Sequence, residues 1–281
     1  MRGRARSPVR TLSGTEAKVV LSLEADGREL VSLSDLMGRA GISREYARKL
    51  AHDLVRKEWL QRVHRGVYLL NPSRHGPAAV PDTDPFRIGR RLADPYYFGF
   101  ATAAELWGLL PQIGRVYYVV SPGSGRSPPG GPVEFRMVHE SPPRFFGTRR
   151  IRRRGESLVV SDLERTVLDC LDRPEFSGGL PGAVHVLASA KRKLDWARIE
   201  RYVRRLGRRS LALRLGYLAE RTRPDIRLPS AWVRRLRPRD ADPFVPLGPP
   251  RVHGRTGPRD RRWHVIRNLS DAHLFGEEEI R

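Results

Sequence analysis

The chain has 281 residues, of which 39% are hydrophobic and 30% are charged. This composition is sufficient to bury a core, so it excludes a fully disordered chain and fits a membrane protein poorly. The length predicts two domains, with one large domain as the alternative. The chain holds 53 Lys and Arg against 31 Asp and Glu, and the net charge of +22 indicates a surface that attracts polyanions.

The positive charge is concentrated in two parts of the chain. Residues 1–75 carry 15 basic and 8 acidic side chains (+7), residues 76–140 carry 6 of each, and residues 141–281 carry 32 and 17 (+15). Only five of the basic residues are Lys, as a GC-rich genome would explain, but codon usage does not explain the excess over acidic residues. We therefore expect the two basic parts to bind nucleic acid.

The cysteine and histidine content and the apolar runs of the chain limit the metal sites, cofactors and cellular compartments that can be expected. A single cysteine, Cys170, excludes an internal disulfide framework and any multi-cysteine metal site, and the eight histidines show no metal-ligand spacing. Neither a metal nor another cofactor is predicted. The apolar run after the basic first ten residues is too short for secretion, and Glu105 and Pro111 interrupt the weakly charged stretch 95–114. We expect a cytoplasmic protein without a membrane-spanning segment.

Three helices are predicted after a basic arm over residues 1–12. Ser13 and Glu16 have the spacing of a capping box, Gly41 is a typical helix stop, and Ser43 is a typical N-cap. Together with the apolar periodicity, these signals predict helices over residues 14–25, 33–40 and 44–57.

A hairpin is predicted directly after the third helix. Residues 60–63 and 67–70 are β-prone runs, and Gly66 supplies the positive φ that the intervening turn needs. Three helices followed by a hairpin are typical of a winged helix-turn-helix domain, here over residues 13–72.

The rest of the chain is predicted to form a second domain and an extension. Residues 71–85 contain four prolines and no helical or strand periodicity. They predict a linker, which we place over residues 73–85. A mixed α/β domain is expected over residues 86–222, and an Arg- and Pro-rich extension over 223–281 contains a final strand at 262–267. The predicted fold class is therefore α+β, with an N-terminal winged helix-turn-helix domain and a mixed α/β C-terminal domain.

Within the second domain, capping signals and apolar runs locate the elements. Thr102 with Glu105 predicts a helix that ends before Pro111, and Ser161 with Glu164 predicts the cap of a later helix. Strands are expected over residues 115–121, 133–139 and 158–160, a loop over 121–132, and helices over 196–206, capped by Asp195, and 209–221.

The third predicted helix carries polar residues away from its apolar stripe. Arg44 and Arg48 are one turn apart, so both can enter a DNA major groove, where one Arg bound to guanine contributes about 1–3 kcal/mol of discrimination. A solvated charged face is the alternative interpretation. The predicted contacts are Ser43, Arg44, Glu45, Arg48, Lys49 and His52.

Two further sets of arginines are predicted to meet the DNA backbone. Arg65, at the hairpin tip, is expected to contact phosphate or the adjacent minor groove. Residues 201, 204, 205 and 208 form a basic stripe on the next-to-last predicted helix, where counterion release would add affinity without sequence information. A solvated face is an equal alternative for this stripe, which consists of Arg201, Arg204, Arg205 and Arg208.

Catalytic patterns each lack a required part. A metal nuclease would need Glu-x-Lys where the chain has Glu134-Phe135-Arg136, and a nucleotidyltransferase would need a carboxylate pair after Gly123-Ser124. Cys170 lies on an apolar helical face, as an inert buried thiol would. No enzyme is predicted. One further cluster of charged residues lies on the helix after the strand at 158–160. A structural role in helix capping and local ion pairs is favoured over a functional site for this cluster, which consists of Asp162, Glu164, Arg165, Asp169 and Asp172.

Several segments resemble one known family. They are residues 41–72 (GISREYARKLAHDLVRKEWLQRVHRGVYLLNP), 97–110 (YFGFATAAELWGLL), 159–171 (VVSDLERTVLDCL) and 215–218 (LGYL), with a weaker match at 260–268 (DRRWHVIRN). Together they are similar to the AbiEi antitoxins of type IV toxin–antitoxin systems, over about residues 13–221. The resemblance covers motifs that look structural, and the tail beyond residue 221 is more Arg-rich than the family pattern.

The resemblance implies a DNA-binding transcriptional repressor and antitoxin. Its winged helix would bind operator repeats in double-stranded DNA and repress its own operon. Its C-terminal domain would counteract a nucleotidyltransferase toxin without a stable complex. Alternatives are a nucleic-acid-processing enzyme with a nuclease-like C-terminal domain, a stand-alone transcriptional regulator, and a coating protein that binds all DNA alike.

Overall fold

The computed structural model describes residues 10–64, 66–76, 84–111, 116–123, 127 and 133–275. The chain divides into two compact units. The first contains Met1–Asp94 with the short segments Arg115–Tyr117 and Ser124–Met137, and the second contains Pro95–Gly114, Tyr118–Gly123 and Val138–Arg281. None of the helices in the described ranges combines the length and the apolar composition that a membrane span requires.

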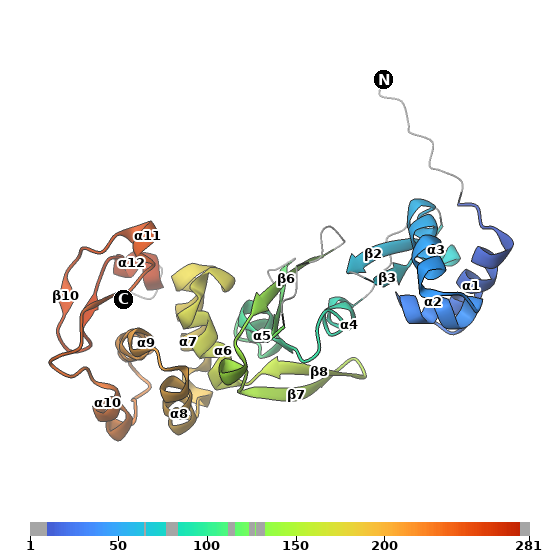
Figure 1. The fold of residues 1–281 in the computed structure, drawn as a ribbon. Helices are drawn as coiled ribbons and strands as arrows, with labels where there is room; N and C mark the ends of the chain where they lie inside the picture. Colours follow the sequence, from blue (N-terminus) through green and yellow to red (C-terminus); the bar gives the residue numbers. More distant parts are fainter. Residues whose placement is uncertain are drawn as a thin grey trace. The chain divides into compact units, whose positions relative to one another are not determined.

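The first unit begins with three helices and a three-stranded antiparallel sheet (Figure 1). The helices are Gly14–Ala25 (α1), Leu33–Ala40 (α2) and Arg44–Arg56 (α3), and the strands are Leu30–Ser32 (β1), Leu60–His64 (β2) and Val67–Leu70 (β3). The strand order is β1-β3-β2. The three predicted helices and the hairpin are confirmed, whereas the sequence pattern did not predict β1.

Local capping fixes the helix ends of this unit. The Ser13 hydroxyl accepts a hydrogen bond from the Glu16 N–H at 3.4 Å, and the Glu16 carboxylate accepts one from the Ser13 N–H at 2.6 Å. Gly41 ends α2 at a φ of 64°. The Ser43 hydroxyl accepts from the Tyr46 N–H at 3.3 Å and starts α3. The buried faces meet in a core that includes Val19, Val20, Leu23, Leu36, Leu50, Leu54, Trp59 and Leu70.

Two short elements follow the small sheet. They are a 3₁₀ turn at Ser73–His75 and the helix α4 at Pro85–Gly89. Arg87 of α4 pairs with Glu29 at 2.5 Å, so α4 is held to the segment before β1. Of the predicted linker, residues 77–83 lie outside the described part of the chain.

A five-stranded sheet has the order β6-β5-β4-β8-β7, which makes β6 and β7 its edge strands. β4 pairs antiparallel with β5 and parallel with β8, and β7 pairs antiparallel with β8. The strands are Tyr97–Phe98 (β4), Val116–Ser121 (β5), Glu134–His139 (β6), Thr148–Arg153 (β7) and Glu156–Ser161 (β8). The predicted β5, β6 and β8 are confirmed, and β7 was not predicted.

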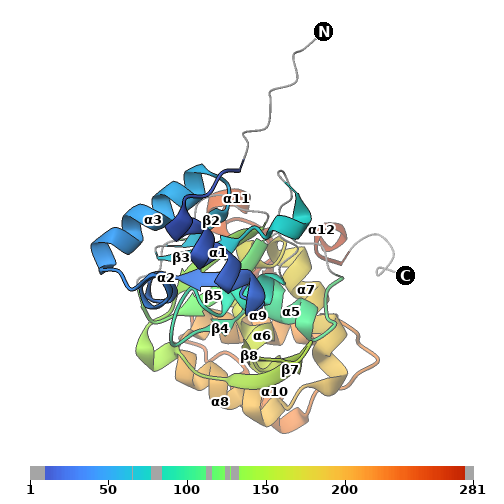
Figure 2. The ribbon, with the colours of Figure 1, turned by 90° about the vertical axis from the view of Figure 1, so that its right-hand side faces the viewer.

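Helices of the second unit gather around α6, which packs against α5, α7, α8 and α9 (Figure 2). Their bounds are Phe100–Leu106 (α5), Leu163–Asp172 (α6), Gly179–Ala190 (α7), Trp196–Leu206 (α8) and Arg209–Arg221 (α9). The predictions for α8 and α9 are confirmed residue for residue. The mixture of helices and strands confirms the mixed α and β character predicted for the chain.

The residues after 223 pack into the same core as the helices before them. They form α10 (Ser230–Leu236), α11 (Pro250–His253), α12 (Asp271–Phe275) and a small sheet of Val245–Pro246 (β9), Arg259–Asp260 (β10) and Val265–Ile266 (β11). The Trp263 ring lies against Gly216 of α9, where an added Cβ would come within 2.0 Å of it. The Trp263 indole N–H donates to the Glu220 carboxylate at 2.8 Å. Gly216 therefore lets this segment dock on α9.

Three local predictions are wrong in detail. α5 begins at Phe100 with Gly99 as its N-cap, so Thr102 lies inside the helix, where its hydroxyl accepts from the Tyr118 N–H at 2.8 Å. α6 is capped by Asp162, whose carboxylate accepts from the Arg165 N–H at 2.8 Å, while Ser161 shares a hydrogen bond with Thr166. The final strand predicted at 262–267 is limited to Val265–Ile266.

Candidate nucleic-acid interface

Helix α3 buries one face and presents the other to solvent. Ala47, Leu50, Ala51 and Leu54 are buried in the core of the first unit. The opposite face is exposed over Ser43, Arg44, Glu45, Tyr46, Arg48, Lys49, His52 and Arg56. This face contains every residue predicted to contact DNA on this helix, and it adds Arg56 and Tyr46, of which Tyr46 is 55% exposed.

The basic groups at the start of this face lack intramolecular partners. Within the described ranges, Arg44, Arg48 and Lys49 make no hydrogen bond or ion pair. The nearest acidic pairing on the helix involves Asp53, which lies 3.5 Å from the Arg56 guanidinium and 3.9 Å from the His52 ring. Ser43 is engaged in the N-cap, so its hydroxyl oxygen orients the first turn. The guanidinium groups of Arg44 and Arg48 are therefore available to an external anion.

A groove of about 540 Å³ separates α3 from the β2–β3 hairpin. Arg44, Arg48 and His52 contribute one wall from α3, and Arg62 contributes from β2. The other lining residues are Leu33, Val55, Gly66 and Tyr68. Arg62 carries no signal in the sequence, because its place in the groove depends on how the hairpin lies beside α3. The groove thus has a basic lining drawn from a helix and a strand.

An ion pair and a cation–π contact hold the end of α3 and the start of the hairpin to the rest of the unit. The Lys57 ammonium, just after α3, pairs with the Glu16 carboxylate at 2.6 Å. Burial alone would raise the pKa of Glu16, but hydrogen bonds from Lys57 and Ser13 hold it below its ordinary value. The Arg10 guanidinium lies 3.7 Å from the centre of the Trp59 ring and donates to the Gly76 carbonyl at 2.9 Å. These contacts fix the position of α3 and its basic face within the unit.

Arg65 lies outside the described residues, so its predicted contact stays a prediction. Its neighbour Gly66 adopts a φ of 77°, as the predicted turn requires. The end of the hairpin lies beside the groove through Gly66, which lines it.

The predicted basic stripe has a different environment, and Arg208 lies outside α8, because α8 ends at Leu206 and Arg208 is the N-cap of α9. All four arginines are exposed, but three of them are held by partners in their own unit. Arg204 pairs with Glu200 at 2.6 Å, and Arg208 pairs with Asp172 at 2.6 Å. Arg205 lies 4.0 Å from the centre of the Phe146 ring. Only Arg201 has neither an ion pair nor a hydrogen bond within the described ranges.

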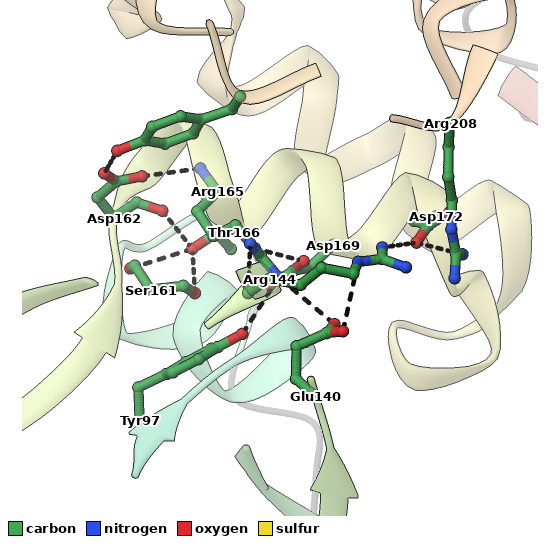
Figure 3. Close-up of polar contacts among 11 residues, drawn as sticks. Tyr97, Glu140, Arg144, Ser161, Asp162, Arg165, Thr166, Asp169, Asp172 and Arg208 are labelled. Carbon is green, nitrogen blue, oxygen red and sulfur yellow. Dashed lines mark hydrogen bonds and ion pairs between the residues drawn. The ribbon is translucent and has the colours of Figure 1, made fainter. Parts of the chain in front are cut away.

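The acidic cluster of α6 forms a polar network around Arg165, whose side chain is fully buried (Figure 3). Its guanidinium pairs with Asp169 at 2.7 Å and with Glu140 at 3.5 Å. It also donates to the Arg144 carbonyl at 2.8 Å and to the Tyr97 hydroxyl at 3.4 Å. These contacts join α6 to β4 and to the segment after β6.

Burial sets the proton affinities in this network. It raises the pKa of Asp169 to about 6 in spite of the adjacent Arg165, and it raises the pKa of Tyr97 well above the ordinary value. Burial would lower the pKa of Arg165, but the charge of Asp169 raises it. The pKa of Asp162 is raised by burial, although the Tyr202 hydroxyl donates to its carboxylate at 2.6 Å. The network orders the second unit around one buried cation.

The carboxylates of this region are occupied by the protein itself. Asp172 accepts from Arg144 and Arg208, and Glu164 accepts from Arg198 and the Asp195 N–H. In the part of the chain that is described, no group of His, Cys, Asp or Glu could hold a metal ion. Cys170 is fully buried, and burial raises the pKa of its thiol. This arrangement fits the interpretation of the α6 cluster as capping and ion pairing.

Comparisons with known proteins bear on the fold and on the first unit. No curated protein sequence matches the chain. The chain is similar to the crystal structure of the RV2827C protein from Mycobacterium tuberculosis, with a TM-score of 0.65 and 20% identity over 91% of this chain and 92% of that one. At this identity the likeness concerns the fold alone. Residues 18–71 match the family model described as "Transcriptional regulator, AbiEi antitoxin", which confirms the predicted resemblance over that segment.

Proposed function

We propose that the protein is a sequence-specific, double-stranded DNA-binding repressor, with its first unit acting as a winged helix. The observation that carries this proposal is the exposed face of α3, where Arg44, Arg48 and Lys49 have no partners within the described ranges. In this interpretation α3 is the recognition helix, and the β2–β3 hairpin is the wing. The family match of residues 18–71 supports the same function.

The dimensions of α3 suit a major groove. Its 13 residues span about 20 Å, and its diameter of about 10–12 Å matches the groove width of about 12 Å. Arg44 and Arg48 lie in the first turns, where recognition helices meet base edges, and each would contribute about 1–3 kcal/mol of discrimination through a bidentate contact to guanine. Glu45 can accept from a cytosine amino group, and the exposed Tyr46 ring can meet a thymine methyl.

Phosphate contacts would come from the groups around these residues. His52 and Arg62 line the groove between α3 and the hairpin, and Lys49 lies on the exposed face of the helix. Arg65 at the wing tip belongs to the same proposal. Contacts of this kind position the protein and carry no sequence information directly. For the α8 stripe, DNA contact stays a prediction that its internal ion pairs weaken.

The second unit would carry the antitoxin function. We infer that it counteracts a nucleotidyltransferase toxin without a stable complex and that the first unit represses the operon of both genes. The two units have separate hydrophobic cores, which supports separable tasks. Such a protein would act in the cytoplasm. A stand-alone regulator is the second candidate, favoured by the family match lying in the first unit alone.

An enzymatic function is disfavoured by the pairing of the acidic groups. Glu134, the acidic residue of the nuclease-like pattern, pairs with Arg136 at 3.1 Å. Asp169 pairs with a buried arginine, so neither carboxylate is poised for a metal ion. We propose binding without catalysis. Metal-dependent cleavage of DNA that is lost in Glu134→Gln would contradict this.

Competition binding tests the repressor proposal. The full-length protein is titrated with a duplex from immediately upstream of its coding sequence and with a scrambled duplex of the same composition. We expect a preference of about 10³-fold or more for the upstream duplex at physiological salt. Arg44→Ala with Arg48→Ala should remove most of it, whereas Arg234→Ala, an exposed arginine of α10, should not. Equal binding of the two duplexes by the wild type would contradict sequence-specific repression.

Coexpression tests the antitoxin proposal. A nucleotidyltransferase reading frame adjoining this gene is expressed from a heterologous promoter that the protein does not regulate. The full chain should restore growth, and so should the Arg44→Ala, Arg48→Ala variant, because protection would depend on the second unit. Loss of protection in that variant would indicate that DNA binding accounts for the effect.

A further inference from the structure

The β7–β8 hairpin of the second unit carries a dense positive charge. Five of the six residues from 149 to 154 are Arg, and Glu156 is the one acidic residue between positions 148 and 157. β7 is an edge strand of the five-stranded sheet, with β8 on its inner side. Figure 1 shows the turn of this hairpin at the end away from α7 and α9.

The strand register separates the arginines onto two faces. Arg150 lies opposite Val159, and Arg152 lies opposite Ser157, so these two arginines share one face of the hairpin. Both are exposed. The other face holds Ile151, opposite the buried Leu158. Arg150 and Arg152 are two residues apart, which is roughly 6.6 Å along a strand, so their guanidinium groups can reach neighbouring phosphates of one DNA strand.

The turn adds a third exposed arginine in an unusual backbone conformation. Arg153 pairs with Glu156 across the hairpin, which leaves Arg154 and Gly155 as the two turn residues. Their φ values are +47° and +78°. A two-residue turn of this type favours Asn-Gly or Gly-Gly, because a side chain at positive φ is disfavoured. An arginine at this tip is explained better by a ligand than by the turn.

These arginines contrast with Arg204 of α8 and with Arg208, the N-cap of α9. Arg150, Arg152 and Arg154 make no hydrogen bond or ion pair in the described part of the chain, whereas Arg204 and Arg208 are held by carboxylates. Charged side chains do protect edge strands from pairing with other chains, but that role needs only one or two of them and none at the turn. The hairpin therefore presents the more available positive charge.

We propose that the β7–β8 hairpin binds the phosphate backbone of duplex DNA through Arg150, Arg152 and Arg154. This inference rests on the proposed repressor function and adds a second, sequence-independent contact to it. β7 and β8 contain no aromatic residue on which unstacked bases could stack, which favours a duplex over single-stranded nucleic acid. The hairpin would thus raise affinity for all duplexes equally.

The salt dependence of binding tests the inference in the full-length protein. The triple variant Arg150→Gln, Arg152→Gln, Arg154→Gly is compared with wild type on the upstream duplex and on the scrambled duplex. Each lost phosphate contact should reduce the slope of log K against log salt by about one unit, so the expected reduction is about two to three units on both duplexes. The ratio of the two affinities should not change.

A matched control removes the same charge elsewhere in the second unit. Arg227, Arg234 and Arg255 are exposed, and their replacement by Gln should leave the slope close to wild type. The single variant Arg154→Gly separates binding from folding, because Gly suits the positive φ. It should not lower the melting temperature, yet it should weaken binding to the scrambled duplex.

The possible outcomes distinguish the two proposals. Unchanged affinity and slope in the triple variant, or equal losses in the control triple variant, would overturn the hairpin inference and leave the repressor proposal intact. If the wild type binds both duplexes equally but the triple variant still reduces the slope, the repressor proposal fails and the hairpin contact stands.

Discussion

The arginines of α3 and those of α6 and α8 lie in opposite surroundings. On α3, Arg44 and Arg48 are exposed and unpaired within the described ranges. Arg165 of α6 is fully buried between carboxylates, and Arg204 of α8 and Arg208, the N-cap of α9, each bind one. The same residue type is thus available for a ligand in one unit and stabilises the fold in the other. Charge identifies a binding surface only where no carboxylate of the chain is within reach.

The largest expected effect comes from disrupting the core beneath the α6 network. Leu168 is fully buried, so Leu168→Asp places an unpaired charge there and should cost several kcal/mol and unfold the second unit. Hydrogen exchange of the full-length variant should show lost protection in α6 to α9 and retained protection in α1 to α3. Simultaneous loss in all helices would contradict separate cores, and Leu54→Asp should give the converse pattern.

A smaller loss is expected from removing the buried cation. Arg165→Met leaves the carboxylates of Asp169 and Glu140 buried without their partner, which should lower the free energy of unfolding by about 3–5 kcal/mol. Chemical denaturation of the full chain measures it, with Arg201→Met on the exposed face of α8 as the control. A loss below about 1 kcal/mol, typical of a surface pair, would refute the structural role.

The pH dependence of stability tests the same network through the titration of Asp169. The folded state raises the pKa of Asp169 to about 6, above the ordinary value of about 3.9, so it holds that proton more firmly than the unfolded state does. The associated stabilisation is complete below about pH 4 and is lost as the pH rises through about 6, by roughly 3 kcal/mol.

Asp169→Asn removes this titration. Between pH 4 and 7, wild type should lose about 3 kcal/mol relative to Asp169→Asn in the free energy of unfolding. Asp240→Asn, which changes an exposed carboxyl, should show no comparable divergence. Parallel pH profiles for wild type and Asp169→Asn would show that the carboxyl titrates alike in both states.

The smallest effect is expected on α8. The exposed Arg204 forms an i, i+4 pair with Glu200, which also binds Arg235 and therefore keeps a partner when Arg204 is removed. An exposed arginine in such a pair contributes about 0–1 kcal/mol. Arg204→Ala should therefore change stability by no more than that and should leave the salt slope of DNA binding within experimental error. A reduction of the slope by about one unit would restore the α8 stripe as a phosphate contact.

Elements whose ends depend on neighbouring residues were predicted correctly, whereas elements that depend on residues distant in the sequence were not. The bounds of α1, α2, α8 and α9 depend on caps and apolar periodicity within each helix, and they were predicted to the residue. Ser161 was taken as the cap of α6, but it is the last residue of β8 and pairs with Thr148 of β7, 13 positions earlier, so the cap falls to Asp162. β7 was missed because its four arginines hide the alternation of apolar and polar residues that marks a strand.

The residues of the candidate site also fall into two groups, those placed by local helical spacing and those placed by contacts between distant parts of the chain. The exposed face of α3 follows from helical spacing alone, so its residues other than Tyr46 and Arg56 were named in advance. Arg62 joins that face only through the fold of the hairpin, and the pairing of Arg208 with Asp172 spans 36 positions. No periodic pattern contains such contacts, and they decide which arginines are available to DNA.

The most direct test of α3 as the recognition helix is a base-pair scan of the upstream duplex, bound by wild type and by Arg44→Ala. Each position is substituted in turn, and the loss of affinity is compared between the two proteins. If Arg44 reads a base, substitution at one or two positions should cost the wild type about 1–3 kcal/mol of binding free energy and should cost the variant nothing. At all other positions the two proteins should show the same losses. A profile that is uniformly weaker at every position, or unchanged throughout, would contradict base recognition by α3.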